Sequence, residues 1–396
     1  MVCLGAALSL FVVMGLGVNT FTIYQPEIIA INGFTNAQGS WITTTRSLFI
    51  LATLLTVNQL CAKLGLRLVM TLGMLLMGLS CFFFGLSATF PMYCFSAALA
   101  GVGYCLGGMV PLSLVISNWF TARRGLALGL ASAGSGVATI FAPSAVTALI
   151  RSSGLKTAFF AEGGFILVLC AVTFLLLRDT PASTGRTPYG GEAAAPVSAP
   201  SGREGHGKKP VLLILLASFL LGGPVGPAFS HLTVLFTSEG FDPVTVAGLI
   251  SYMGLAITVS KILCGQLYDR LGGLRSNYIV LIVYLAGILL CALAGTGSLP
   301  LAYLAITTFS FGISVTGVSP AVWAKDLVSD ADYPSTVRAI TTAYTLGMLV
   351  FGPIPGVLAD RYGSYIPAYL LFALFQLLLT ALIQGVYHKL GVGRRP

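Results

Sequence analysis

Charged side chains are scarce in this sequence: they make up 8% of its 396 residues, and only 12 residues are acidic. Soluble domains carry roughly 25% charged residues, so the composition argues against an ordinary soluble fold. The sequence also lacks CxxC pairs, metal-ligand clusters, phosphate-binding loops and catalytic triads. We therefore expect no metal, no cofactor and no enzymatic activity. The eight cysteines lie in or near apolar segments, as small core residues do.

Long apolar runs are what the chain has instead, with 56% hydrophobic residues and a mean hydropathy of +0.92. A helix of about 20 apolar residues crosses the hydrocarbon core of a bilayer. By this rule the sequence predicts an all-α membrane protein with twelve transmembrane helices. The first lacks a basic leader and a cleavage site, so we expect it to be retained. The helices begin near Cys3, Ser40, Leu68, Tyr93, Gly125, Thr157, Pro210, Val244, Tyr278, Ala302, Ala339 and Ile366.

The basic residues predict the orientation of these helices. Only Arg151, Lys156 and Arg361 fall in the loops that would lie outside if the N-terminus is inside. The positive-inside rule therefore places both termini in the cytoplasm and the chain in the cytoplasmic membrane. The same rule accounts for the net charge of +9, so the excess of basic residues does not indicate a nucleic-acid-binding protein. We expect a monomer whose partners are lipid and a small solute. The inner residues are Lys63, Arg67, Arg123, Arg124, Arg178, Arg186, Arg203, Lys208, Lys209, Arg270, Arg275, Lys325, Arg338, Lys389, Arg394 and Arg395.

An internal repeat divides the chain into two halves. Gln59-Leu60 and Lys63-Leu64-Gly65 match Gln266-Leu267 and Arg270-Leu271-Gly272 at an offset of 207 residues. A parallel duplication of this kind predicts two six-helix bundles with a substrate site between them. We expect bundles at residues 1–177 and 210–396, joined by a flexible cytoplasmic linker at 178–209 that is rich in Gly, Pro, Ala and Ser.

Two basic residues lie inside apolar segments: Arg46 within Ser40–Cys61 and Lys261 within Val244–Tyr268. A cation at the bilayer centre costs about 2.5–3.5 kcal/mol, so such residues usually face a cavity or a partner. Neither segment holds an acid at comparable depth. An anionic ligand is the simplest counter-charge. The repeat places the two cations about 12 Å apart in depth, so they could serve different conformational states.

Other polar residues could line a substrate cavity. His231 maps onto Tyr24 through the repeat, and it could carry a proton or form a hydrogen bond at an outer gate. Glu27 and Glu162 lie near outer helix ends, where we expect hydration or capping. The remaining candidates are Asn19, Tyr104, Tyr252 and Tyr344.

The segment Gly265–Arg275 resembles the loop pattern G-x-x-x-D-R-x-G-x-x-R of the major facilitator superfamily. This resemblance implies the major facilitator fold and a cytoplasmic latch formed by Asp269 and Arg270. The first-half copy departs from the pattern at Asn58 and Ala62. Asn118-Trp119-Phe120 with Arg123-Arg124-Gly125, and Asp360-Arg361-Tyr362-Gly363, resemble the monocarboxylate and oxalate–formate branch. Arg123 and Arg124 are then expected to take part in gating.

The branch resemblance also bears on Lys261. It stands four residues before Gly265, where monocarboxylate transporters place an Arg that binds the substrate carboxylate. Those transporters place an acidic residue one turn before this Arg, and the corresponding residue here is Ile257. Their proton-coupled mechanism is therefore not carried over. The oxalate–formate antiporter has two cations and no buried acid, but its second cation lies in helix 11. In this chain Arg46 in helix 2 would take that role.

These observations predict a secondary active transporter of small organic anions, mono- or dicarboxylates, working by alternating access and by exchange. The alternatives are a proton-coupled carboxylate symporter and an exporter of larger amphipathic anions such as bile acids or drugs. A membrane receptor would carry a sizeable soluble domain, and a membrane enzyme would carry a catalytic constellation; the sequence shows neither.

Overall fold

The computed structural model describes residues 1–120, 124–181, 185, 187–190, 207–329 and 332–392. Within these residues the chain is helical, with loops and one isolated bridge between Phe120 and Tyr189. The chain forms two compact units. Unit 1 contains Met1–Phe34 and Trp41–Val197, and unit 2 contains Thr35–Ser40 and Ser198–Pro396.

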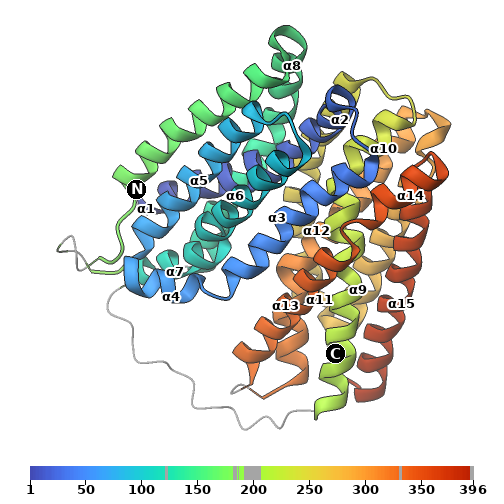
Figure 1. Cartoon of the computed structure of the whole chain (residues 1–396). Helices are drawn as coiled ribbons and strands as arrows, with labels where there is room; N and C mark the ends of the chain where they lie inside the picture. Colours follow the sequence, from blue (N-terminus) through green and yellow to red (C-terminus); the bar gives the residue numbers. More distant parts are fainter. Residues whose placement is uncertain (121–123, 182–184, 186, 191–206, 330–331, 393–396) are drawn as a thin grey trace. The chain divides into compact units, whose positions relative to one another are not determined.

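Unit 1 is built around a long helix that packs against the N-terminal helices and against α5, while α5 packs on α6 (Figure 1). The first transmembrane segment is continuous in sequence but changes from α- to π-helix and back. The elements are α1 (Val2–Leu10), η1 (Phe11–Thr20), α2 (Phe21–Asn32), α3 (Asn36–Leu54), α4 (Val57–Leu64), α5 (Leu66–Leu86), α6 (Phe90–Gly107), α7 (Met109–Trp119) and α8 (Arg124–Leu176).

Unit 2 is organised around α11, which packs against α12 and α15, and around α9, which packs against α13 and α15. It also holds the first turn of α3. Its elements are α9 (Lys208–Ser230), α10 (Leu232–Ser238), α11 (Pro243–Cys291), η3 (Ala294–Thr296), α12 (Leu299–Leu327), α13 (Tyr333–Phe351), α14 (Ile354–Tyr362) and α15 (Ile366–Leu390).

The lengths of these helices account for the twelve predicted spans. Among the described residues, nine stretches are long and apolar enough to cross a membrane, and the bent pair α3–α4 would be a tenth. Two of the nine, α8 and α11, have 53 and 49 residues, about twice what one crossing needs. Each is broken by a glycine with positive φ, Gly154 at 82° and Gly272 at 74°, a conformation that glycine adopts without strain. Each therefore supplies two crossings, which confirms the predicted fold class.

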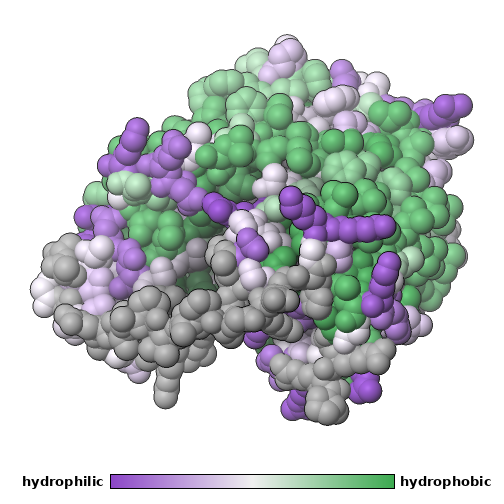
Figure 2. Space-filling model, turned by 90° about the horizontal axis from the view of Figure 1, so that it is seen from below, coloured by the Kyte–Doolittle hydropathy of each residue, from purple (hydrophilic) through white to green (hydrophobic). Residues whose placement is uncertain are grey.

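Large apolar side chains are exposed on both units, as expected where helices face lipid. Phe141 and Leu175 of unit 1 are each 68% exposed, and Leu212 of unit 2 is 66% exposed. Figure 2 shows apolar side chains in green over broad areas of one face of the molecule, with hydrophilic ones in purple among them. An exposed apolar surface of this kind is typical of a protein that contacts the hydrocarbon chains of membrane lipids.

The start of the predicted linker is fixed to unit 1. Asp179 Oδ1 accepts a hydrogen bond from the Arg67 amide at 2.8 Å, at the first turn of α5. Trp119 Nε1 donates to the Arg178 carbonyl oxygen at 3.0 Å. Asp179 therefore caps the start of α5, and the Arg178 carbonyl holds the start of the linker against Trp119. Most of the remaining linker lies outside the described residues.

Candidate functional site

Arg46 lies on α3 in unit 1 and is only 5% exposed. Its Nη1 donates to the Gly17 carbonyl oxygen at 3.3 Å, and its guanidinium carbon lies 5.1 Å from the centre of the Phe21 ring. Tyr104 of α6 is the titratable group that faces it. A guanidinium has five N–H donors, and only one hydrogen bond engages them within the described residues. The buried cation therefore keeps donors for a ligand.

The acceptor of Arg46 belongs to the π-helical segment η1. Wider π-helical turns occur frequently at functional sites. The Thr20 hydroxyl donates to the Gly15 carbonyl oxygen, five residues earlier, at 3.0 Å. A β-carbon at Gly15 would clash with Ala138 of α8, so this part of the helix depends on glycine for close packing. Asn19, at its end, donates to the Thr139 hydroxyl at 2.7 Å.

Tyr24 lies among aromatic rings rather than beside Arg46. It is 1% exposed, it stacks on Phe159 with 4.0 Å between ring centres, and its hydroxyl donates to Glu162 Oε2 at 2.5 Å. Glu162 is itself only 8% exposed. The prediction that Glu162 is hydrated or capping is therefore wrong. Its position on α8 turns the carboxyl towards α2, where aromatic side chains exclude water.

Lys261 lies on α11 in unit 2 and is half-buried. It forms no hydrogen bond and no ion pair within the part of the chain that the structure describes. Ile257, one turn earlier, is buried at 7% exposure and offers no charge. Neighbouring Ser260 fixes the helix at this depth, because its hydroxyl contacts the Ser314 hydroxyl of α12 at 2.6 Å. The ammonium group thus lies on a helix fixed to α12, and it has no counter-charge among the described residues.

The other candidates of unit 2 have protein partners. The Tyr252 hydroxyl lies 2.8 Å from the Thr307 hydroxyl, and its ring packs edge-on against Tyr303 at 5.1 Å. Tyr344 is half-buried on α13. His231 is fully buried between α9 and α10. Its Nδ1 donates to the Pro227 carbonyl oxygen at 2.8 Å, and its Nε2 lies 2.7 Å from the Ser40 hydroxyl. Both ring nitrogens are therefore engaged in hydrogen bonds.

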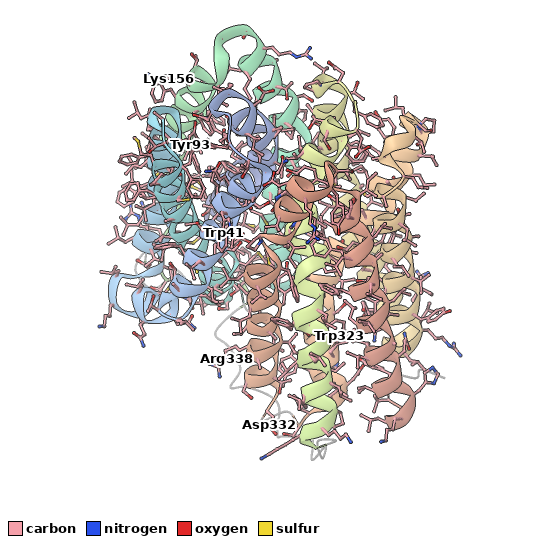
Figure 3. All side chains as sticks on the ribbon, turned by 45° about the vertical axis from the view of Figure 1, so that its right-hand side comes forward. Trp41, Tyr93, Lys156, Trp323, Asp332 and Arg338 are labelled. Carbon is pink, nitrogen blue, oxygen red and sulfur yellow. The ribbon has the colours of Figure 1, made fainter. Side chains whose placement is uncertain are left out.

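The predicted cytoplasmic latch residues are partly described. Asp269 and Arg270 are exposed on α11, just before its break at Gly272. A buried network anchors this bend. Asn277 Oδ1 accepts from the Tyr268 hydroxyl at 2.7 Å and from Trp323 Nε1 at 2.8 Å, and Trp323 lies in the interior of unit 2 (Figure 3). Arg123 and the side chain of Arg124 lie outside the described residues.

The structure thus brings Arg46, Tyr104 and the η1 backbone together in unit 1, and leaves Lys261 unpartnered among the described residues of unit 2. Comparison with known proteins decides what kind of molecule carries these sites. The sequence model of the Major Facilitator Superfamily matches residues 6–333. The chain belongs to the Major Facilitator Superfamily. It is therefore a multi-pass membrane transporter, and this family is one of transporters rather than enzymes.

Similar sequences within the superfamily include monocarboxylate transporters. Monocarboxylate transporter 12 of Rattus norvegicus is 28% identical over 74% of this chain and 65% of its own length. Monocarboxylate transporter 13 of Bos taurus is 26% identical over 95% of this chain and 86% of its own length. The chain thus spans about two thirds of the first of these relatives.

Solved major facilitator structures share the fold. A bacterial homologue of the human lysosomal transporter Spinster, inward-facing and occupied, superimposes with a TM-score of 0.71 at 14% identity, covering 100% of this chain and 97% of that one. The nucleoside transporter NupG gives 0.75 at 13% identity, covering 98% and 100%. At this identity the likeness concerns the fold alone.

Two features of the site were missed or misread in the sequence. Glu162 was visible as an acid in an apolar segment, but its distance from the helix end gave no sign of the aromatic side chains around it. The π-helical segment η1 left a weak signal, the closely spaced Gly15 and Gly17 in the first apolar run.

Proposed function

We propose that this transporter carries small organic anions, mono- or dicarboxylates, and that Lys261 binds the substrate carboxylate. The observation that carries this proposal is the half-buried ammonium group of Lys261, which has no counter-charge among the described residues. A substrate carboxylate would supply that charge through hydrogen bonds worth about 1.5–3 kcal/mol. The names of the monocarboxylate transporter relatives support the same substrate class.

Arg46 is proposed as the second substrate-binding cation. Its contacts to one carbonyl oxygen and one ring orient the guanidinium but leave its positive charge unneutralised. An Arg stays protonated at any working pH, and its planar donor fork matches a carboxylate. Tyr104, which faces it, is the proposed hydrogen-bonding neighbour in unit 1.

Exchange is the proposed mode of transport. Two unneutralised cations make the empty carrier costly to close, because a charge away from water needs a partner. A bound dianion, or an anion at each cation, removes this cost. Return of the loaded carrier should then be faster than return of the empty one.

A proton-coupled symporter is the second candidate, and the Tyr24–Glu162 pair is the observation that favours it. An ionisable group inside a membrane segment marks a functional site by default. Glu162 lies among aromatic rings, and no described Lys or Arg pairs with it. In this second candidate, the Glu162 carboxyl group carries one proton per cycle.

The proposed orientation keeps both termini in the cytoplasm, with the chain in the cytoplasmic membrane. Within unit 2, Asp332 and Arg338 lie near the start of α13 (Figure 3), and Lys325 lies in the last turn of α12. This end, with the exposed Asp269 and Arg270, is the proposed cytoplasmic face and gate. Arg361 lies in the last turn of α14, at the end that is proposed to be external.

The experiment that tests the proposal is counterflow in proteoliposomes with a panel of labelled carboxylates. Liposomes preloaded with unlabelled substrate should take up label much faster than empty liposomes. Equal rates with and without preload, together with strong stimulation by an inward proton gradient, would replace exchange by proton-coupled symport. Transport of none of the carboxylates would contradict the substrate class itself.

A further inference from the structure

The first turn of α3 is held by a carboxylate from the other end of the sequence. Both oxygens of Asp360, at the end of α14, accept backbone hydrogen bonds, from the amides of Asn36 and Ala37, at 2.8 Å each. These amides belong to the N–H groups that a helix start leaves without an internal partner. A carboxylate at this position gains from the hydrogen bonds and from the helix dipole.

The surface that presents Asp360 is rigid. The turn after α14 contains Gly363 at a φ of 72°, followed by Ser364, whose hydroxyl donates to Glu239 Oε1 at 2.6 Å. The next residue, Tyr365, is buried, and its hydroxyl donates to Asn36 Oδ1 at 2.9 Å. The turn is therefore bound to Glu239, the residue after α10, through Ser364, and to α3 through Tyr365.

Close packing completes this contact. A β-carbon at Gly356 of α14 would clash with the Asn36 carbonyl oxygen and with the Ser40 hydroxyl, so α3 approaches α14 where there is no side chain. Ser40 is fully buried and contacts His231, which is fixed in turn by the Pro227 carbonyl. We call Asn36–Ser40, Gly356, Asp360 and Tyr365 the α3 clasp. All of its residues belong to unit 2, whereas α3 beyond Ser40 belongs to unit 1.

The repeat shows that this arrangement is not required merely to start a helix. Helix α11 is the counterpart of α3, and it is capped by its own Asp242, which accepts from the amides of Val244 and Thr245. At the offset of 207 residues, Asp242 corresponds to Thr35. Among the described residues, the Thr35 hydroxyl accepts a hydrogen bond from the Gln38 amide alone, at 3.2 Å. Asp360 therefore caps the Asn36 and Ala37 amides. The start of α3 depends on this residue of unit 2 rather than on a residue of its own.

We propose that the α3 clasp is a conformational latch at the end of unit 2 opposite the C-terminus. The first turn of α3 leaves Asp360, Tyr365 and Gly356 when this end of the transporter opens, and docks again when it closes. Asp360 is a positioning residue here, and it takes no part in binding the substrate. The latch does not depend on which anion is carried.

The test measures the opening of the clasp directly in full-length protein in lipid nanodiscs, where a reagent reaches both faces. The parent protein carries Ser40→Cys, and the rate of its reaction with a maleimide is corrected for the native cysteines with the unsubstituted chain. Asp360→Asn replaces one acceptor with a donor and removes the charge. We expect it to raise the labelling rate of the new cysteine about tenfold or more. Amide hydrogen exchange at residues 36 and 37 should rise in parallel.

Two further variants separate a latch from a general loss of stability. Tyr365→Phe removes only the hydrogen bond to Asn36 and should raise the labelling rate by a smaller factor. Asp242→Asn removes the charge from a cap of the same kind at α11, and it should leave the labelling rate at the parent value. Parent-like labelling in Asp360→Asn would overturn the proposal. If Asp360→Asn fails to insert, parent-like labelling in Tyr365→Phe would overturn it. An equal rise in Asp242→Asn would also overturn it.

Discussion

The guanidinium of Arg46 donates to the carbonyl oxygen of Gly17 at 3.3 Å, and Gly17 lies in the π-helical segment of the first transmembrane helix. This single hydrogen bond orients a buried cation without neutralising it. Most of its N–H donors have no hydrogen-bond acceptor among the described residues. Under the proposed function, this hydrogen bond holds the side chain in place for a substrate anion.

Arg46→Lys should reduce carboxylate uptake by about tenfold or more, although it keeps the charge. Lysine lacks the planar donor fork, and each lost hydrogen bond to a charged ligand costs about 1.5–3 kcal/mol. The loss should appear mainly in KM, measured from initial rates of labelled uptake. Arg67→Lys is the matched control, because Arg67 also binds a backbone carbonyl and an aromatic ring, at Phe174. Equal effects of the two substitutions would contradict a substrate role for Arg46.

Glu162→Gln should abolish any stimulation of uptake by an inward proton gradient while leaving exchange between preloaded forms intact. The neutral amide keeps an acceptor for the Tyr24 hydroxyl but cannot carry a proton. Tyr24→Phe serves as the control, because it removes the hydrogen bond and keeps the acid. Stimulation that persists in Glu162→Gln would show that another group carries the proton.

Gly15→Ala should destabilise the protein by about 1–3 kcal/mol, the usual cost of overpacking a close helix contact. The new methyl group would clash with Ala138 and approach the Ser135 carbonyl oxygen. Thermal unfolding of the purified protein measures the change. Gly164→Ala, in α8 of the same unit, meets no atom within 4 Å. It should be neutral or slightly stabilising because alanine favours helix. Equal melting temperatures would contradict the packing described for η1.

The membrane architecture could be predicted from the sequence because hydropathy reports directly on bilayer crossing. The starts predicted near Gly125, Thr157, Val244 and Tyr278 match α8 and α11, each crossing twice around one glycine. Arg46 and Lys261 could be found in the same way, because a cation is conspicuous in an apolar run. Their roles in binding stay a prediction.

Contacts between distant segments could not be predicted in this way. Asp360 binds α3 across 324 positions of sequence, and neither helix carries a pattern that marks its partner. Glu162 was misread because its place along the helix says nothing of the side chains that cover it. The π-helical turn also depends on tertiary packing, since its glycines contact α5 and α8.

The central claim is that Lys261 binds the carboxylate of the transported anion. Its most direct test is carboxylate counterflow by Lys261→Gln in proteoliposomes, with protein insertion verified and with Lys156→Gln as control. Lys156 is a suitable control because it lies on α8 and is not one of the proposed site residues. Among the described residues, its ammonium group contacts only the Phe160 ring of the same helix. We predict loss of counterflow in Lys261→Gln and normal counterflow in Lys156→Gln. Counterflow at the wild-type rate in Lys261→Gln would contradict the claim.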